Sequence, residues 1–143
     1  MTEQAEQFID TNVLVYAFDH TNPKKHLSCR QLLEKLLIKG GVVSNQVLAE
    51  LFYVLSRKLP KPMGTEGALR AVNALAESPT LRRVDYGTNT VKKAATLCFK
   101  TGAGFWDALI AETMLENGVQ TICTENEKDF KKIPGVRVSN PFK

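Results

Sequence analysis

The chain has 143 residues, of which 43% are hydrophobic, and this is the size and composition of one globular domain with its own core. Lysine and arginine (19) outnumber aspartate and glutamate (15), so the net charge of +4 is compatible with an anionic partner but equally with an ordinary basic surface. The three separated cysteines exclude a disulfide framework or a zinc knuckle, and the absence of a signal peptide or a long apolar run predicts a cytoplasmic protein that does not enter a membrane.

Short β-branched runs alternate with longer amphipathic stretches, which is typical of a parallel sheet with helices on both faces. We therefore predict a three-layer α/β/α fold around a central, mainly parallel sheet of about five strands. Residues 1–6 are expected to form a flexible N-terminal tail, and residues 7–143 a single domain. In chain order, strands are expected over 8–10, 42–44, 81–84, 121–123 and 136–138, and helices over 25–39, 46–57, 64–76, 88–100 and 105–117.

Asp10 stands where the first apolar run stops being compatible with a single strand. The sequence Asp10-Thr11-Asn12 favours the start of a helix, so we expect the strand to end at Asp10 and a short helix to follow. Open parallel sheets bind their ligands beyond the carboxyl ends of the strands. Asp10 is therefore either a helix cap or a residue of a functional site, and this segment by itself does not decide between the two.

Glu50 lies at the margin of the apolar stripe of the predicted helix over 46–57, beside Val47 and Val54. A glutamate in the middle of a helix is usually just a solvated residue, because glutamate is a good helix former. Its place on the helix nevertheless allows the side chain to point along the edge of the sheet.

Asp107 falls in the first turn of a helix that is apolar on nearly every side. The helix dipole stabilises such a carboxylate by about 0.3 to 1 kcal/mol, whereas isolating its charge costs several. No lysine or arginine is nearby in the sequence. These facts favour a bound cation, with a basic side chain from elsewhere in the chain as the alternative.

A polar, acidic segment follows the strand predicted over 121–123. We expect Asp10, Glu50, Asp107 and one or both of Asn126 and Asp129 to converge at the carboxyl edge of the sheet. Several carboxylates repel one another unless a positive charge lies between them. Ligands that are all oxygen favour Mg²⁺ or Mn²⁺ over zinc.

These motifs resemble the PIN domain, of the kind found in VapC-type toxins of bacterial and archaeal toxin–antitoxin pairs. The resemblance covers residues 8–140 and rests on the order and spacing of three motifs. They are Ile-Asp-Thr-Asn-Val-Leu-Val-Tyr-Ala, Gln-Val-Leu-Ala-Glu-Leu, and Phe-Trp-Asp-Ala-Leu-Ile-Ala followed by a strand that ends in Thr-x-Asn-x-x-Asp-Phe.

The resemblance implies a metal-dependent endoribonuclease that hydrolyses RNA phosphodiester bonds with a metal-activated water. By resemblance, Asp10, Glu50 and Asp107 hold Mg²⁺ or Mn²⁺, and polar residues line or brace the site. It also implies a cognate antitoxin and a homodimer, for which the stretches 46–55 and 27–38 supply either an interface or simply core. The matching polar positions are Thr11, Asn12, Ser44 and Thr124.

The fourth acidic position departs from the family pattern. Many relatives carry an aspartate where this chain has Asn126, and the nearest aspartate here is Asp129. We favour Asp129 as the fourth acidic residue, with Asn126 positioning a water or a ligand. Two other functions stay open: a non-catalytic RNA-binding or partner-binding module on the same fold, and an Asp-nucleophile phosphatase, which requires a second aspartate where this chain has Asn12.

If four acids gather in the site, a basic rim remains for sequence-independent contacts with phosphates. For each rim residue alone, a solvated surface position is the simpler interpretation. We expect the aromatic residues Phe52, Tyr53, Phe105 and Trp106 to belong to the core rather than to stack on bases. The candidate rim residues are Lys24, Lys25, Arg57, Lys58, Lys61, Lys92, Lys93, Lys128 and Lys131.

Overall fold

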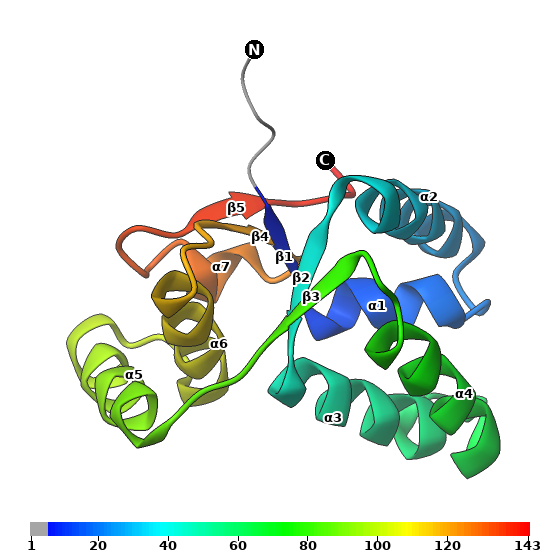
Figure 1. Ribbon diagram of the computed structural model, residues 1–143, viewed down its shortest axis with the longest axis horizontal. Coiled ribbons are helices and arrows are strands. Elements are labelled where there is room, and N and C mark those ends of the chain that lie inside the picture. The colour runs from blue at the N-terminus through cyan, green and yellow to red at the C-terminus, as the bar shows by residue number, and fades with distance from the viewer. Residues whose placement is uncertain (1–5) are drawn as a thin grey trace.

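A five-stranded parallel sheet forms the centre of the computed structural model, which describes residues 6–143 (Figure 1). Every strand pair is parallel and the strand order is β3-β2-β1-β4-β5. This arrangement confirms the predicted fold class. The strands are β1 (Gln7–Ile9), β2 (Gly41–Ser44), β3 (Leu81–Val84), β4 (Thr121–Cys123) and β5 (Arg137–Ser139).

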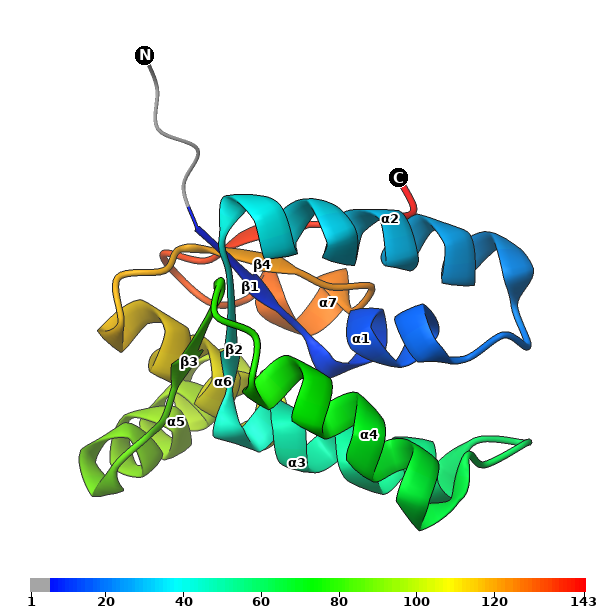
Figure 2. The ribbon, with the colours of Figure 1, turned by 45° about the vertical axis from the view of Figure 1, so that its right-hand side comes forward.

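Helices cover both faces of the sheet, as Figures 1 and 2 show. One layer contains α1 (Thr11–Phe18), α2 (Pro23–Lys39), α3 (Asn45–Tyr53), the π-helical turn η1 (Val54–Lys58) and α4 (Gly64–Ala76). The other contains α5 (Thr88–Thr101), α6 (Phe105–Glu116) and the short α7 (Glu127–Phe130). Right-handed crossovers require this division, because the chain moves across the sheet one way from β1 to β3 and the other way to β4 and β5.

The core lies on the central strands, where Phe8, Val42 and Ile122 have no exposed surface. Such continuous burial is expected of a parallel sheet that is covered on both faces. At Gly41 a Cβ atom would lie 3.0 Å from Ile9 Cδ1 and 3.3 Å from Leu36 Cβ. The glycine therefore lets α2 pack closely against the start of β2.

The direction of chain progression across the sheet reverses between β1 and β4. The carboxyl ends of these adjacent strands, at Ile9 and Cys123, are paired in register. Crevices at such a reversal are where open α/β sheets bind ligands. Asp10 and Thr124 follow these two strand ends directly, so the topology places both residues at the crevice.

Most predicted elements agree with the structure to within one or two residues at their ends, and two segments differ in kind. The helix predicted over 46–57 changes to the π-helical turn η1 after Tyr53, and α7 forms in a segment that we expected to be a loop. Of the predicted N-terminal tail, residues 1–5 lie outside the described residues, and Glu6 pairs with Arg82 at 2.9 Å. Among residues 6–143, no helix combines the length and the apolar character needed to cross a bilayer.

Candidate active site

Asp10 is both a helix cap and a member of a polar cluster. Its Oδ1 atom accepts a hydrogen bond from the backbone N–H of Thr11 at 2.8 Å, which caps α1. Its Oδ2 atom accepts from Thr124 Oγ1 at 2.7 Å and from Asn12 Nδ2 at 3.2 Å. With only 5% of its surface exposed, Asp10 is a buried carboxylate that is held in one orientation by residues from both β1 and β4 strand ends.

Glu50 extends from α3 toward the same cluster. Thr11 Oγ1 donates to Glu50 Oε2 at 2.7 Å, and Gln46 Nε2 donates to Glu50 Oε1 at 2.9 Å. Ser44 is buried and makes no hydrogen bond to Glu50 itself. Its Oγ atom accepts a hydrogen bond from Val47 N at 3.1 Å and caps α3, the helix that carries Glu50. Gln46 was not among the predicted site residues, although its i, i+4 spacing to Glu50 is a detectable signal of such a pair.

Asp107 lies in the first turn of α6, in the other helical layer, and Asn126 connects it to the cluster around Asp10. The Asn126 Nδ2 group donates to Asp107 Oδ2 at 2.7 Å and, at 3.4 Å, to Asp129 Oδ2. Thr124 Oγ1 in turn accepts from the backbone N–H of Asn126 at 2.9 Å. Asn126 therefore connects Asp107, Asp129 and the loop after β4, and Asp129 reaches the cluster only at its edge.

A cavity of about 490 Å³ joins these side chains at the carboxyl ends of β1 and β4. Among residues 6–143, no lysine or arginine nitrogen lies within 4.0 Å of a carboxylate oxygen of Asp10, Glu50 or Asp107. The same part of the chain contains no tight group of three acidic, histidine or cysteine ligands, so the carboxylates border the cavity rather than meet at one point. The predicted site residues that line it are Asp10, Thr11, Asn12, Glu50, Asp107 and Asn126.

Burial and mutual repulsion control protonation in this cavity. Desolvation raises the pKa of Asp10, the hydrogen bonds from Thr124 and Thr11 oppose the rise, and the charge of Glu50 adds to it. Desolvation, followed by the charges of Asp10 and Asp129, raises the pKa of Asp107 to about 7. Desolvation also acts upward on Asp129, but the hydrogen bond from Asn126 and the charge of Lys132 outweigh it and lower its pKa.

The raised pKa values predict that the metal-free protein loses stability as pH rises. In the unfolded chain Asp107 deprotonates near its ordinary pKa of 3.8, whereas in the folded chain it holds its proton to about pH 7. The folded state therefore binds more protons between these values, and its free energy of unfolding falls by on the order of 2 kcal/mol between pH 5 and pH 7. Urea unfolding in EDTA at pH 5 and pH 7.5 measures this difference. Equal or greater stability at pH 7.5 contradicts the repulsion that we infer.

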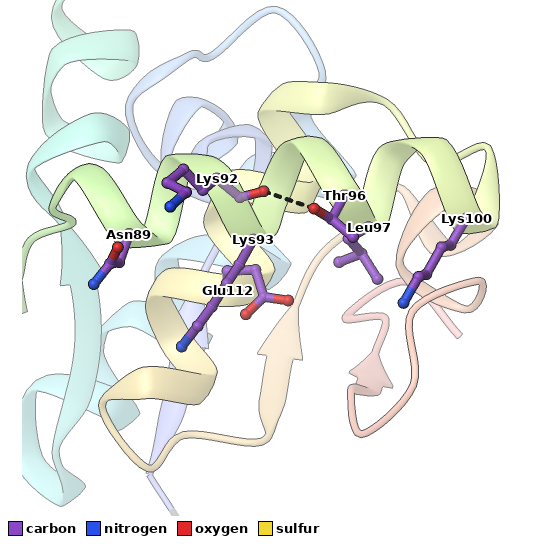
Figure 3. Close-up of a pocket in the computed structure, with 7 residues that line it drawn as sticks. All are labelled: Asn89, Lys92, Lys93, Thr96, Leu97, Lys100 and Glu112. Atoms are coloured by element: carbon purple, nitrogen blue, oxygen red, sulfur yellow. Dashed lines mark hydrogen bonds between the residues drawn. The ribbon is translucent and has the colours of Figure 1, made fainter.

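Several candidate rim lysines are already paired with acidic side chains. Lys25 Nζ lies 2.5 Å from Glu125, Lys93 Nζ 3.4 Å from Glu116, and Lys131 Nζ 3.3 Å from Glu127. Lys92 and Lys100 have no such ion pair within the described residues, and both are exposed on α5. Figure 3 shows these lysines with Lys93 along one side of α5, above Glu112 of α6, where they border a hollow of about 490 Å³.

The expectation that four aromatic residues belong to the core is wrong for two of them. Trp106 is 62% exposed and Tyr53 is 52% exposed. Phe52 is partly buried against the main core, and Phe105 packs against a small cluster made by Ala94, Ala108 and Leu109. Trp106 directly precedes Asp107, and Tyr53 lies three residues after Glu50 on the same helix.

The sequence matches the model of the PIN domain family over residues 8–136. It is 26% identical over 140 residues to Ribonuclease VapC48 of Mycobacterium tuberculosis, and the match covers 93% of this chain and 95% of that protein.

Solved structures are similar over nearly the whole chain. The VapBC2 complex of Rickettsia felis, bound to a promoter DNA fragment, includes a chain that is 27% identical with a TM-score of 0.68, and the match covers 94% of this chain and 97% of that one. DNA-bound VapBC of Salmonella typhimurium includes a chain with 20% identity and a TM-score of 0.70, with 96% and 99% covered. The fold, the acidic cavity at the sheet edge and the family match over residues 8–136 agree, and this chain belongs to the PIN domain family.

Proposed function

We propose that this protein is a metal-dependent endoribonuclease and the toxin of a toxin–antitoxin pair. The observation that carries the proposal is the acidic cavity at the crevice between β1 and β4, which is lined by Asp10, Glu50 and Asp107 without a basic partner for these acids in the described part of the chain. The similarity to Ribonuclease VapC48 supports RNA as the substrate class. The three acidic residues that the resemblance assigns to the metal, Asp10, Glu50 and Asp107, all line this cavity.

The donor set fits a hard divalent cation, because every group that lines the acidic side of the cavity offers oxygen. Asp10 and Asp107 are the proposed direct ligands of Mg²⁺ or Mn²⁺, and Glu50 acts at longer range or through a water. When bound, such an ion lowers the pKa of a water and offsets the negative charge that builds on the phosphoryl oxygens.

The remaining residues of the cluster orient these ligands. Thr124 and Asn12 fix the Asp10 carboxylate, Thr11 and Gln46 fix Glu50, and Asn126 fixes Asp107. Each contact is a hydrogen bond from a neutral donor, so the contacts orient the acids without neutralising them. Partners of this kind typically change metal affinity or activity by 10- to 100-fold when removed.

A cognate antitoxin and a second copy of the chain are the proposed protein partners, in a cytoplasmic setting. The similar structures from Rickettsia felis and Salmonella typhimurium are VapBC complexes, which supports an antitoxin for this chain as well. Exposed apolar side chains on α2 provide surface for a protein contact, since Leu27 is 58% and Ile38 is 83% exposed.

Cleavage of RNA by the purified protein tests the proposed activity directly. We expect cleavage of single-stranded RNA in Mg²⁺ or Mn²⁺, complete loss in EDTA, and recovery when either ion is restored. Gel analysis of end-labelled RNA measures this, with Ca²⁺ and Zn²⁺ as comparison ions. Cleavage that persists in EDTA contradicts metal dependence, and RNA binding without cleavage in any metal indicates a non-catalytic module instead.

The free lysines of α5 are expected to contribute to RNA binding through phosphate contacts. Substituting both Lys92 and Lys100 by alanine should weaken binding and reduce the slope of log K against log salt by roughly 0.7 per lost contact. Fluorescence anisotropy of a labelled RNA at several salt concentrations measures the slope. The matched control substitutes Lys35 and Lys39, which are exposed on α2 in the other helical layer. An equal change in slope for both double variants contradicts a specific role for α5.

A further inference from the structure

A second cavity, of about 820 Å³, adjoins the acidic one on the other side of Glu50. It is built by three segments that are distant in the sequence: α3 along its whole length, the residues that follow β3, and the start of α6. We call it the aromatic groove, after the three rings on its walls. Its lining residues are Asn45, Gln46, Ala49, Glu50, Tyr53, Asp85, Tyr86 and Trp106.

Three aromatic side chains of the groove are left open to solvent. Trp106 is 62%, Tyr53 52% and Tyr86 38% exposed. Trp106 makes a T-shaped contact with Phe105 at 5.2 Å between ring centres, and the Lys58 ammonium lies over the Tyr53 ring, 5.1 Å from its centre. Several large aromatic rings around one hollow are unusual on a free surface and are typical of a binding site.

The side chains of Gln46 and Glu50 connect the groove to the acidic cavity. Gln46 Nε2 donates to Glu50 Oε1 at 2.9 Å and to the backbone carbonyl of Trp106 at 3.3 Å. Glu50 itself lines both cavities. One ligand can therefore extend from the groove into the acidic cavity, past Glu50.

The chemistry of the walls favours a neutral, planar ligand. The charged side chains that line the groove, Glu50 and Asp85, are acidic and repel phosphate. The amides of Asn45 and Gln46 can hydrogen-bond to a base edge, and the Gln46 Oε1 atom has no hydrogen-bond partner within the described residues. Aromatic rings with neutral amides are the means by which proteins hold unpaired bases.

We propose that the aromatic groove binds a nucleobase of the RNA strand next to the phosphodiester that enters the acidic cavity. The proposal rests on the proposed ribonuclease function and extends it, since it assigns a base-stacking subsite to Trp106, Tyr86 and Tyr53. The phosphates then follow the acidic cavity and the basic rim, while one base leaves the strand and stacks in the groove.

Trp106 is the single tryptophan of the chain, so its fluorescence reports on the groove alone. In EDTA, which prevents cleavage of the probe, we expect a six-nucleotide single-stranded RNA to quench this fluorescence saturably. The same oligonucleotide with abasic residues throughout should bind more weakly and leave the fluorescence unchanged. Because stacking on an aromatic ring strengthens binding by about tenfold per base, Trp106→Ala and Tyr86→Ala should each raise the Kd, measured by anisotropy, about tenfold.

Two variants separate stacking from other effects. Trp106→Phe keeps a ring for stacking and should retain most of the affinity. Phe99→Ala removes another exposed ring, 90% exposed on α5 and outside the groove lining, and should leave the Kd unchanged. Circular dichroism checks that each variant is folded.

The possible results distinguish this proposal from the proposed activity. RNA that binds and is cleaved by the wild type without quenching Trp106 overturns the base subsite and leaves the nuclease intact. Quenching without cleavage in any metal supports the subsite and overturns the nuclease. A fluorescence change that depends on protein concentration in the absence of RNA, together with loss of dimer in Trp106→Ala, assigns the groove to a second copy of the chain and overturns the proposal.

Discussion

Replacing Asp107 by asparagine is expected to lower the rate of RNA cleavage about a thousandfold and to stabilise the metal-free protein. The first effect follows because a metal ion supplies several kcal/mol of transition-state stabilisation, and about 4 kcal/mol corresponds to a thousandfold in rate. The second follows because burial and the charges of Asp10 and Asp129 hold the pKa of Asp107 near 7, so its ionised form is unfavourable in the fold at higher pH. Asparagine keeps an oxygen that can accept the hydrogen bond from Asn126.

Two measurements on the same samples test this opposition of activity and stability. Single-turnover cleavage in Mg²⁺ gives the loss of rate, and urea unfolding in EDTA at pH 7.5 gives the gain in stability, which we expect to be about 1 to 2 kcal/mol. Glu34→Gln, an equal change of charge on the exposed face of α2, should leave the rate unchanged and alter stability by less than about 0.5 kcal/mol, since it removes only an exposed ion pair with Arg30. A variant that is both inactive and less stable indicates that Asp107 is a structural residue, contrary to our proposal.

The strands and most helices could be predicted because their signals are local. Strands β3 and β4 have the predicted bounds, and helix α4 begins and ends as predicted. Helix α5 begins as predicted and ends one residue later than predicted, where Gly102 adopts the left-handed conformation that glycine favours. Helix α7 lacked such a signal, because its four residues include only one buried side chain, Phe130, and are too few to show a period.

The convergence of the acidic residues depends on topology that no local pattern contains. Asp10 and Thr124 are 114 residues apart in the sequence, and their hydrogen bond exists because β4 inserts beside β1 after the chain has already formed β2 and β3. The convergence was expected because a parallel sheet brings the carboxyl ends of its strands to one edge, and the resemblance to a family agreed with that expectation. Gln46 was not predicted because a glutamine on a helix is usually a solvated residue. Its role becomes evident only once Glu50, its hydrogen-bond partner, is known to face the site.

The exposure of Trp106 shows the limit of hydrophobicity as a guide to burial. Trp106 lies in an apolar segment that continues as Ala108 to Ala111, all of which are buried. Trp106, however, lines the groove together with residues of α3 and Tyr86, and its side chain stays exposed there. This exposure depends on segments that are distant in the sequence, so the apolar pattern of α6 alone does not predict it.

The fourth corner of the site is expected to depend more on Asn126 than on Asp129. The sequence favoured Asp129, but Asn126 lines the acidic cavity, whereas Asp129 lies at the edge of the cluster and is 3.7 Å from Lys132. Asn126→Ala removes the donor that holds Asp107, so we expect cleavage to fall by about 10- to 100-fold. Asp129→Asn should cost less than about tenfold, because it alters a neighbour of that contact.

The Mg²⁺ concentration that half-saturates cleavage separates a ligand from a positioning residue. Loss of a direct ligand should raise it strongly, as in Asp107→Asn, whereas loss of Asn126 should lower the maximal rate more than it changes the metal requirement. Asn126→Asp provides the complementary test, since a carboxylate 2.7 Å from Asp107 would increase repulsion, lower stability in EDTA and strengthen metal binding. A different result assigns the position to Asp129: Asp129→Asn lowers the cleavage rate and raises the required Mg²⁺ concentration as much as Asp107→Asn does. Asp129 is then the fourth acidic ligand, and α7, which carries it, moves toward the cavity when the ion binds.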